Sequence, residues 1–333
     1  MNTDNPPLVS VLTPVYNGGK YLRECIESVL AQTYSNWDYT IVNNCSTDET
    51  PRIAEEYARK DSRIRVYHND ALLDVIANHN KAFRLISPQS RYCKVVSGDD
   101  WLFPECMAQM VRVAEAHPSA GLVGSYQLCG RGSDWDTWRI TWDQLPYPST
   151  LLSGRDVCRV RFLGGPYVFG NPTSLLYRSD LIRAQDRFFP NSTAEGDTSA
   201  CFNCLKQADF GFVHQVLSFK RLHEQTMTAI SRSLNAYASS YLSDLVEYGP
   251  SYLTPDELNQ RLRKVVWGYY RFLGASVFHF RNAAFWAYHK RRLSECRQRF
   301  SYARLGMAVL VKGADLLLNP KQTLEKLMNR ATR

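Results

Sequence analysis

The sequence predicts an α/β protein with a mainly parallel sheet and helices on both of its faces. Short apolar runs rich in β-branched residues alternate with segments in which apolar residues recur at helical spacing, which is the pattern of repeated strand-helix units. Polar loops follow three of the expected strands. With 333 residues and 44% apolar content, the chain can bury one large core and carry an appendage.

The first strand-helix unit is expected at the amino terminus. The apolar run 8–13 predicts a strand that ends in the segment 14–19, because proline and glycine interrupt the run there. A helix is expected between Gly19 and Gln32. Its apolar stripe consists of Leu22, Ile26, Val29 and Leu30.

The second unit repeats this arrangement. A strand is expected at 39–42, followed by the polar loop 43–49. Ser46 and Glu49 have capping-box spacing, so a helix should begin near Thr50. Both units place polar side chains after a strand, and in an open α/β sheet ligands bind outside the carboxyl ends of the strands.

The same alternation continues toward residue 225. Strands are expected at 64–67 and 92–96, and helices at 75–86 and 105–116. A helical run at 198–207 precedes a further strand at 210–217. This rhythm favours a mainly parallel sheet.

An adjacent carboxylate pair follows the strand at 92–96. Asp99 and Asp100, in the run Ser97-Gly98-Asp99-Asp100, repel each other unless a cation or a hydroxyl-rich ligand lies between them. Oxygen-preferring divalent cations are held by one or two carboxylates together with phosphate oxygens. The pair therefore predicts a metal-diphosphate site, while turn and helix-cap chemistry ahead of Pro104 is an equally simple account.

Two common nucleotide-binding signatures are absent from the sequence. The chain has neither a glycine-rich dinucleotide fingerprint nor a phosphate-binding glycine loop that ends in Lys-Ser or Lys-Thr. Dehydrogenase and P-loop functions therefore lose support.

Three motifs together resemble the nucleotide-sugar half of family 2 glycosyltransferases with the GT-A fold, of the type found in bacterial polysaccharide biosynthesis. They are Pro14-Val15-Tyr16-Asn17, Asn43-Asn44-Cys45-Ser46-Thr47-Asp48 and Ser97-Gly98-Asp99-Asp100, within residues 8–225 that follow the family pattern. The resemblance implies that Pro14 and Tyr16 lie at the nucleotide-sugar site. It also implies that Asp99 contacts the ribose and that Asp100 binds a Mn or Mg ion on the diphosphate.

The second motif departs from the family pattern. Relatives usually carry two Asp residues where this chain has Asn43 and Asn44, and the later Asp accepts a hydrogen bond from the base. An Asn amide can both donate and accept. Asn44 is therefore expected to contact the nucleotide without fixing the base, whereas a loop that needs turn-forming side chains explains both asparagines as well.

The second half should supply the acceptor site and the catalytic base. In the family an acidic residue before a helix removes the proton from the acceptor hydroxyl in an inverting single displacement, and Asp197 matches that position best. Glu195 is the alternative base, and a helix cap is the alternative role for Asp197. Arg221-Leu222-His223 resembles the Arg-x-His ending of relatives, which implies a phosphate contact for Arg221 and a metal contact for His223.

Charge divides the chain. Residues 256–333 carry 16 Lys or Arg against 5 Asp or Glu, a net charge of +11, whereas residues 1–255 carry 24 against 27, a net charge of −3. Together with the motifs, this predicts a GT-A domain at 1–230 and a basic C-terminal helical region at 231–333. The GT-A domain should consist of a nucleotide-sugar half at 1–127 and an acceptor half at 128–230.

The basic region is predicted to be helical and too interrupted by charge to span a bilayer. Its aromatic residues between 265 and 288 lie beside Lys290-Arg291-Arg292, a combination typical of helices on anionic membrane surfaces. A helical bundle packed on the catalytic domain, or an oligomer contact, accounts for the same pattern. No nucleic-acid-binding module accompanies the charge, so nucleic acid is not an expected partner.

Nine cysteines are scattered along the chain, and we expect no signal peptide. We therefore expect reduced thiols and a cytoplasmic protein, peripheral on the inner face of the cell membrane where the basic helices bind it. Cys201 and Cys204 form the single Cys-x-x-Cys. They are expected to pack in the core, because no second pair completes a zinc site.

The sequence thus predicts an inverting, metal-dependent glycosyltransferase that moves a sugar from a nucleotide-diphosphate sugar to a hydroxyl of a glycan or lipid-linked glycan. The alternatives are a nucleotide-sugar-binding protein without turnover and a nucleotidyltransferase on a related α/β fold. The latter needs a basic triphosphate-binding loop after the first strand, where Gly18-Gly19-Lys20 offers little.

Overall fold

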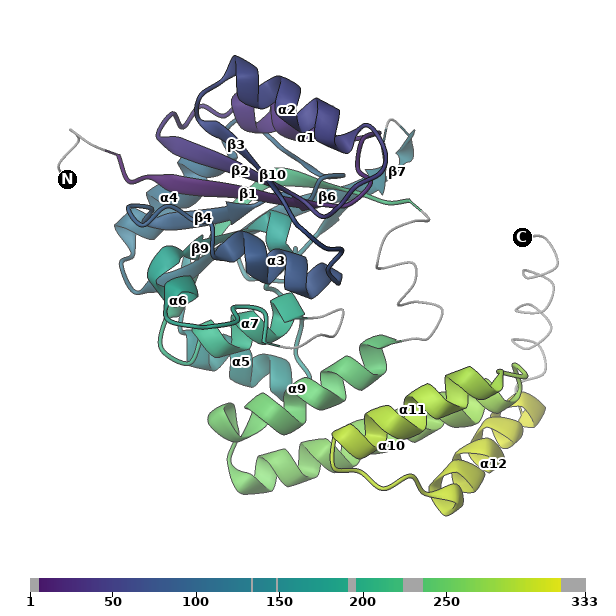
Figure 1. Ribbon diagram of the computed structural model, residues 1–333. Helices are drawn as coiled ribbons and strands as arrows, with labels where there is room; N and C mark the ends of the chain where they lie inside the picture. The colour runs from purple at the N-terminus through teal and green to yellow at the C-terminus, as the bar shows by residue number, and fades with distance from the viewer. Residues whose placement is uncertain (1–5, 133, 148, 191–195, 224–235, 319–333) are drawn as a thin grey trace. The chain divides into compact units, whose positions relative to one another are not determined.

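The computed structural model describes residues 6–132, 134–147, 149–190, 196–223 and 236–318. The chain divides into two compact units, which we call unit 1 (residues 1–229) and unit 2 (residues 230–333). Unit 1 is an α/β structure and unit 2 is helical (Figure 1).

Unit 1 is built on one sheet, which has ten strands among the described residues. The strands are β1 (Val9–Val15), β2 (Trp37–Asn43), β3 (Ile64–His68), β4 (Tyr92–Val95), β5 (Trp101–Leu102), β6 (Ala120–Arg131), β7 (Asp134–Thr141), β8 (Leu151–Leu152), β9 (Leu175–Arg178) and β10 (Asp209–Arg221). Their order is β3-β2-β1-β4-β9-β6-β10-β5, with β7 paired to β6 and β8 to β10.

The sheet is parallel in its first half and mixed in its second. β3, β2, β1 and β4 pair in parallel, as do β6 and β10, whereas β9 is antiparallel to both of its neighbours. The parallel part brings the carboxyl ends of β1, β2 and β4 to one edge, where the predicted motifs follow them.

Helices lie on both faces of the sheet, as predicted (Figure 1). They are α1 (Leu22–Leu30), α2 (Thr50–Lys60), α3 (Val75–Phe83), α4 (Cys106–Ala116), α5 (Gly154–Phe162), α6 (Ser179–Arg183) and α7 (Gly196–Cys204), with a 3-10 turn η1 (Pro172–Ser174) before β9. The α/β fold class is therefore confirmed, and α2 begins at Thr50 as the sequence indicates.

β1 ends at Val15, within the segment 14–19 where its end was predicted, and it includes Pro14, which pairs with Val42. The carbonyl of Leu12 accepts a hydrogen bond from Val96, so the backbone nitrogen of Pro14, two residues on, also faces the β4 side. β4 ends at Val95 and offers Pro14 no pairing partner. A proline without an N–H therefore costs no ladder hydrogen bond there.

The predicted capping box at the start of α2 does not form. The Ser46 hydroxyl accepts a hydrogen bond from the backbone N–H of Asn17, 2.9 Å away, instead of capping the helix. The carboxylate of Asp48 instead accepts hydrogen bonds from the backbone N–H of Thr50, the first residue of α2, at 3.0 Å and from that of Gly19 at 2.9 Å. The polar loop thus joins the two strand ends rather than serving one helix.

The core of unit 1 lies between the sheet and its helices. Val9 and Val11 of β1 pack with the expected α1 stripe and with Met107 and Met110 of α4. Cys201 and Cys204 are buried, which confirms their predicted place in the core. All nine cysteines are free thiols.

Unit 2 contains α9 (Ala236–Tyr252), α10 (Pro255–Val277), α11 (Ala283–Glu295) and α12 (Tyr302–Leu318) among its described residues. A capping box between Thr254 and Glu257 starts α10. The core of unit 2 contains Tyr269, Tyr270 and Phe285, so these aromatic side chains cannot face a membrane. In the described part of the chain, no helix has both the length and the apolar character needed to cross a bilayer.

Candidate active site

The loops after β1 and β2 are tied together at the carboxyl edge of the sheet. Asn17 accepts a hydrogen bond from the backbone N–H of Thr47 at 2.8 Å, and its own N–H donates to Ser46. This contact holds Asn17 at a φ of 49°, which Asn tolerates better than most residues. Pro14 lies in β1 and Tyr16, which is exposed, follows it. The first two motifs are therefore neighbours in space.

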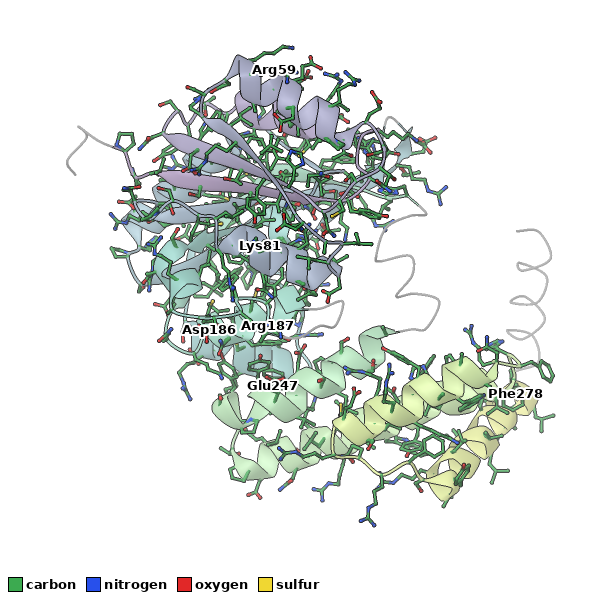
Figure 2. All side chains as sticks on the ribbon, in the orientation of Figure 1. Arg59, Lys81, Asp186, Arg187, Glu247 and Phe278 are labelled. Atoms are coloured by element: carbon green, nitrogen blue, oxygen red, sulfur yellow. The ribbon has the colours of Figure 1, made fainter. Side chains whose placement is uncertain are left out.

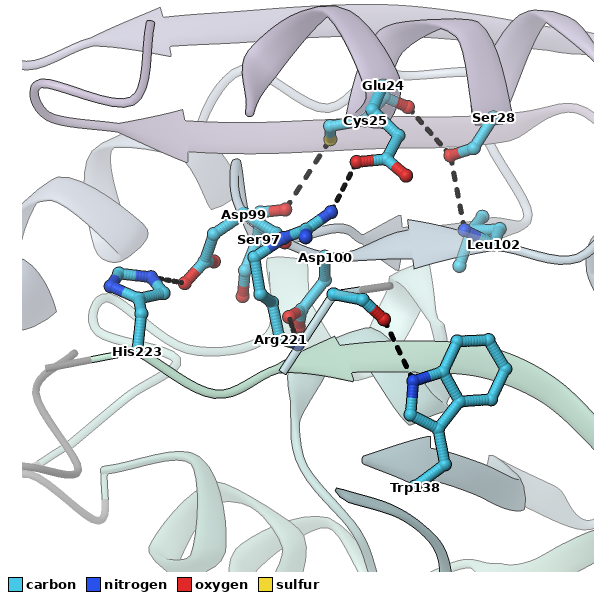
Figure 3. A network of polar contacts seen from close by, with 11 residues as sticks. Glu24, Cys25, Ser28, Ser97, Asp99, Asp100, Leu102, Trp138, Arg221 and His223 are labelled. Carbon is cyan, nitrogen blue, oxygen red and sulfur yellow. Dashed lines mark hydrogen bonds and ion pairs between the residues drawn. The ribbon is translucent and has the colours of Figure 1, made fainter. Parts of the chain in front are cut away.

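Asp99 and His223 meet at the same edge, although 124 positions separate them in the sequence (Figure 3). Nε2 of His223 lies 2.9 Å from Oδ2 of Asp99, and the two side chains are 23% and 29% exposed. The imidazole also packs 5.3 Å from the ring of Tyr21. A carboxylate oxygen and an imidazole nitrogen thus converge where solvent and ligands can reach them.

Asp100, the neighbouring carboxylate, is in a different environment. It is 4% exposed, and its Oδ1 and Oδ2 accept hydrogen bonds from the backbone N–H of Arg221 at 3.0 Å and the hydroxyl of Thr173 at 2.7 Å. Burial, with the nearby charge of Asp99, raises the pKa of Asp100 to about 7. Asp100 therefore joins the end of β10 to η1, and both of its oxygens have protein partners.

Arg221 is held on several sides at the end of β10. Its Nε donates to the carbonyl oxygen of Asp99 at 3.2 Å, and its guanidinium forms an ion pair with Glu24 of α1 (Figure 3). The guanidinium carbon lies 4.4 Å from the ring centre of Tyr21 and 5.0 Å from that of Trp101. Such cation-π contacts fix a cation beside the carboxylate pair.

Sequence reasoning missed two residues that shape this edge. Lys94 of β4 is fully buried, and its ammonium donates to the carbonyl oxygens of Thr173 at 2.6 Å and Leu175 at 3.0 Å. Burial lowers its pKa. Thr173 in turn contacts Asp100 and accepts from the backbone N–H of Ser97 at 3.2 Å. The sequence feature that could have indicated this role is a lysine inside an otherwise apolar strand.

The side chain of Asn44 is buried and forms hydrogen bonds with neighbouring loops. Its amide nitrogen donates to the carbonyl of Leu73 at 2.8 Å, and its oxygen accepts from Asn69 at 2.9 Å and from the Leu73 N–H at 3.0 Å. Asn43 contacts His68 Nδ1 at 3.0 Å. These contacts supply the structural role that the sequence left open, and the nucleotide contact of Asn44 stays a prediction.

Asp197 lies at the beginning of α7. Its Oδ1 accepts a hydrogen bond from the backbone N–H of Thr198 at 2.8 Å, and the Thr198 hydroxyl is 2.9 Å from the Tyr167 hydroxyl. Burial raises the pKa of Asp197, with a partial offset from the hydrogen bond and from the charge of Lys220. Glu195, the alternative base, lies outside the described residues.

The donor atoms fit a divalent cation that also binds a diphosphate. Mg²⁺ and similar ions take one or two carboxylates from the protein and complete their shell with phosphate oxygens and water. Asp99 can supply such an oxygen, and His223 an imidazole nitrogen. No group of three or more His, Cys, Asp or Glu suited to a metal occurs within the part of the chain that the structure describes, so the protein would share the ion with its ligand.

Comparison with protein-family models matches residues 10–183 to Glycosyl transferase family 2, which is more than half of the chain. The chain belongs to this family. A putative glycosyltransferase of Bacillus subtilis, EpsH, is 31% identical over 189 residues, which cover 55% of this chain and 51% of EpsH. The chain thus spans about half the length of EpsH.

Solved structures share the fold of this family 2 chain, the GT-A fold. A fragment of S. aureus TarS in complex with UDP-GlcNAc has a TM-score of 0.57 at 16% identity and covers 78% of this chain and 71% of the fragment. The mannosyltransferase PcManGT from Pyrobaculum calidifontis, in complex with GDP-Man and Mn²⁺, has a TM-score of 0.53 at 14% identity and covers 97% of this chain and 84% of that protein. At these identities the likeness establishes the fold alone.

Proposed function

We propose that this chain is an inverting, divalent-cation-dependent glycosyltransferase. It moves a sugar from a nucleoside diphosphate to a hydroxyl of a glycan or a lipid-linked glycan. The observation that carries the proposal is the meeting of Asp99 and His223 beside Arg221, at the ligand-binding edge of a family 2 sheet. The UDP-GlcNAc and GDP-Man of the structural neighbours support a nucleotide-sugar donor.

In this proposal Asp99 and His223 would hold the cation, which would supply positive charge beside the diphosphate leaving group. The resemblance of the motifs implied a metal contact for Asp100 and a ribose contact for Asp99. We move the metal role to Asp99 because its carboxylate faces His223, whereas both Asp100 oxygens accept protein hydrogen bonds. Asp100 then positions the ends of β10 and η1.

Arg221 remains the proposed contact for the diphosphate. Its guanidinium is paired with Glu24 in the structure, so a donor phosphate must displace or share this ion pair. The diphosphate of a nucleotide sugar carries more negative charge than one carboxylate, and its oxygens accept the same forked hydrogen bonds from Arg. The rings of Tyr21 and Trp101 keep the guanidinium in place during the exchange.

Asp197 is the proposed base. A new bond forms between the acceptor oxygen and the anomeric carbon while the bond from that carbon to the diphosphate oxygen breaks on the opposite face, so the configuration inverts. The acceptor proton passes to Asp197. Its raised pKa makes this carboxylate a better proton acceptor than an exposed Asp.

The expected cytoplasmic location stays a prediction. The contact of the basic helices with an anionic membrane also stays a prediction, and it loses the support of Tyr269, Tyr270 and Phe285, which are buried in unit 2.

The test begins with the donor. Thermal stabilisation is measured for UDP-, GDP-, TDP- and ADP-sugars, each with Mn²⁺, with Mg²⁺ and with a chelator. The proposal expects one nucleotide to stabilise the protein only when a divalent cation is present. Slow release of the nucleoside diphosphate by that donor then shows turnover, and NMR of a transferred product shows the anomeric configuration.

Three results would change the conclusion. Stabilisation without release of nucleoside diphosphate, with or without acceptors, favours the nucleotide-sugar-binding protein. Release of pyrophosphate from a nucleoside triphosphate and a sugar phosphate favours the nucleotidyltransferase. Retention of configuration in the product excludes the single-displacement mechanism and, with it, the role of Asp197 as the base.

A further inference from the structure

The outer face of α12 is exposed and apolar. Six large side chains on it, which we call the α12 face, are Tyr302, Met307, Leu310, Val311, Leu317 and Leu318. Leu310, Leu317 and Leu318 are 70%, 81% and 80% exposed. At 100° per residue these six cover roughly half of the helix circumference, and only alanines and glycines lie between them.

This exposure does not come from a loosely placed helix. The opposite side of α12 packs on α10 through Ala308, which is buried in the core of unit 2. A Cβ added to Gly274 of α10 would lie 2.8 Å from the Cβ of Ala308, so the two helices are in close contact. The packing against α10 fixes which side of α12 is left outside.

A second apolar element lies at the end of α10. Tyr270 contacts the start of α12 by accepting from the N–H of Ser301, and Gly274 faces Ala308, so α10 and α12 run side by side in the same direction. This register places Phe278 level with the second half of α12, at the end of α10 (Figure 2). Phe280, two residues on, is 95% exposed.

Positive charge predominates around these apolar residues, and Asp315, paired with Lys312, is the acidic residue of α12. Residues 255–318 carry 12 Lys or Arg against 4 Asp or Glu, a net charge of +8. The ammonium of Lys290 donates to the Tyr302 hydroxyl at 3.1 Å on one border of the α12 face. Arg304 is exposed on the other border, and Arg281 is exposed directly after Phe280.

We propose that the α12 face and Phe280 dock on an anionic lipid bilayer, with α12 lying in the plane of the interface. Large aliphatic and aromatic side chains on one face, bordered by Lys and Arg, suit the boundary between acyl chains and anionic head groups. A second copy of this chain would bring two surfaces of the same positive sign together, which the charge opposes. The proposal is independent of the reaction that unit 1 performs.

The test uses the full chain and sedimentation with vesicles. One set is pure phosphatidylcholine and the other contains phosphatidylglycerol at one part in three. The parent protein binds the anionic vesicles more tightly, and added salt weakens binding because it screens the charges. The double variant Leu310→Gln, Leu317→Gln binds them at least about tenfold more weakly, since each leucine loses its transfer into an apolar medium.

Phe280→Ser should also weaken binding to the anionic vesicles. Phe280 lies in a loop and makes no core contact, so its replacement leaves the fold unchanged. Tyr147→Ser is the control, because Tyr147 is also an exposed aromatic residue, at 79% exposure, but lies in unit 1, and it leaves vesicle binding unchanged. Circular dichroism confirms that each variant is folded.

Three results overturn the proposal. The first is a parent protein that does not bind anionic vesicles, and the second is a double variant that binds them as the parent does. The third is a parent dimer in analytical ultracentrifugation that the double variant converts to a monomer while vesicle binding is unaffected, which assigns the face to a second copy.

Discussion

The ammonium of Lys94 lies 2.6 Å from the carbonyl oxygen of Thr173, and the Thr173 hydroxyl lies 2.7 Å from a carboxylate oxygen of Asp100. A fully buried cation thus holds the turn that contacts the carboxylate pair. A buried charge is costly unless hydrogen bonds satisfy it, and here two carbonyl oxygens do so. The position of Asp100 thus depends on a lysine inside β4, the strand that precedes the carboxylate pair.

Lys94→Met should lower the free energy of unfolding by about 1–3 kcal/mol, because the carbonyls of Thr173 and Leu175 lose their donor inside the core. Urea denaturation of the donor-free protein measures this loss. Lys60→Met is the control, since the ammonium of Lys60 pairs with Glu56 on the surface. That control should change stability by less than about 1 kcal/mol. If the Lys94 variant is as stable as the parent, the free energy of burying the charge equals the stabilisation that its hydrogen bonds provide.

His223→Gln should abolish the contribution of Mn²⁺ to donor binding, because the imidazole is half of the proposed metal pair. Isothermal titration of the preferred donor, with and without Mn²⁺, measures it. The nucleoside alone should bind the variant and the parent equally. His279→Gln, at an exposed histidine of unit 2, is the matched control. A variant that keeps the full Mn²⁺ effect removes His223 from the metal site.

The two neighbouring carboxylates should respond differently to the same change. Asp99→Asn should weaken Mn²⁺-dependent donor binding by about tenfold or more, because it removes the charge that faces the cation. Asp100→Asn should leave most of that binding intact. Burial raises the pKa of Asp100 to about 7, and a neutral amide resembles the protonated carboxyl that is already populated near that pH. If the two variants exchange these phenotypes in the same titration, Asp100 is the metal ligand, as the sequence first indicated.

Asp197→Asn should keep donor affinity while lowering the transfer rate by roughly 10²- to 10⁴-fold, the range that general-base catalysis contributes. Steady-state kinetics of transfer, beside titration of the donor, separates the two quantities. Normal transfer by the variant points to Glu195 or to no base. Loss of donor binding instead places Asp197 with the diphosphate.

The pH dependence of kcat/KM should show an acid limb that belongs to Asp197. The base acts only when it is deprotonated, so activity falls as pH decreases through its pKa. Burial raises this pKa, which places the limb above the ordinary value of 3.8 for an Asp. A profile that stays flat down to the pH where the protein unfolds, as monitored by circular dichroism, contradicts the role of Asp197.

The alternation of apolar runs was enough to predict the α/β class, because it depends on local periodicity. The start of α2 at Thr50 was also predicted correctly, although the capping box that indicated it does not form. Contacts between distant segments could not be predicted in the same way. Ser46 has the spacing of a capping residue, yet its hydroxyl accepts from Asn17, which the sheet brings beside it. Pro14 stays in a strand because β4 has already ended on its side.

The same limit applies to the site. The motifs placed Asp99, Asp100, Arg221 and His223 at one edge, but spacing could not decide which carboxylate faces the imidazole. That choice depends on Thr173 and on the end of β10, which take both oxygens of Asp100. In unit 2, helical spacing alone did not separate the buried Tyr269 and Tyr270 from the exposed Leu310 and Leu317, because all four belong to apolar stripes.

Phe280 has a φ of 47°, a conformation that costs an ordinary L-residue roughly 1–2 kcal/mol and that Gly or Asn adopts with far less strain. Its ring returns none of this energy to the fold, since it is almost wholly exposed. Selection for heat resistance in lipid-free buffer should therefore replace Phe280 by Gly or Asn. The same replacement should be selected against wherever the enzyme must stay at a membrane, so the two conditions would favour different residues at position 280.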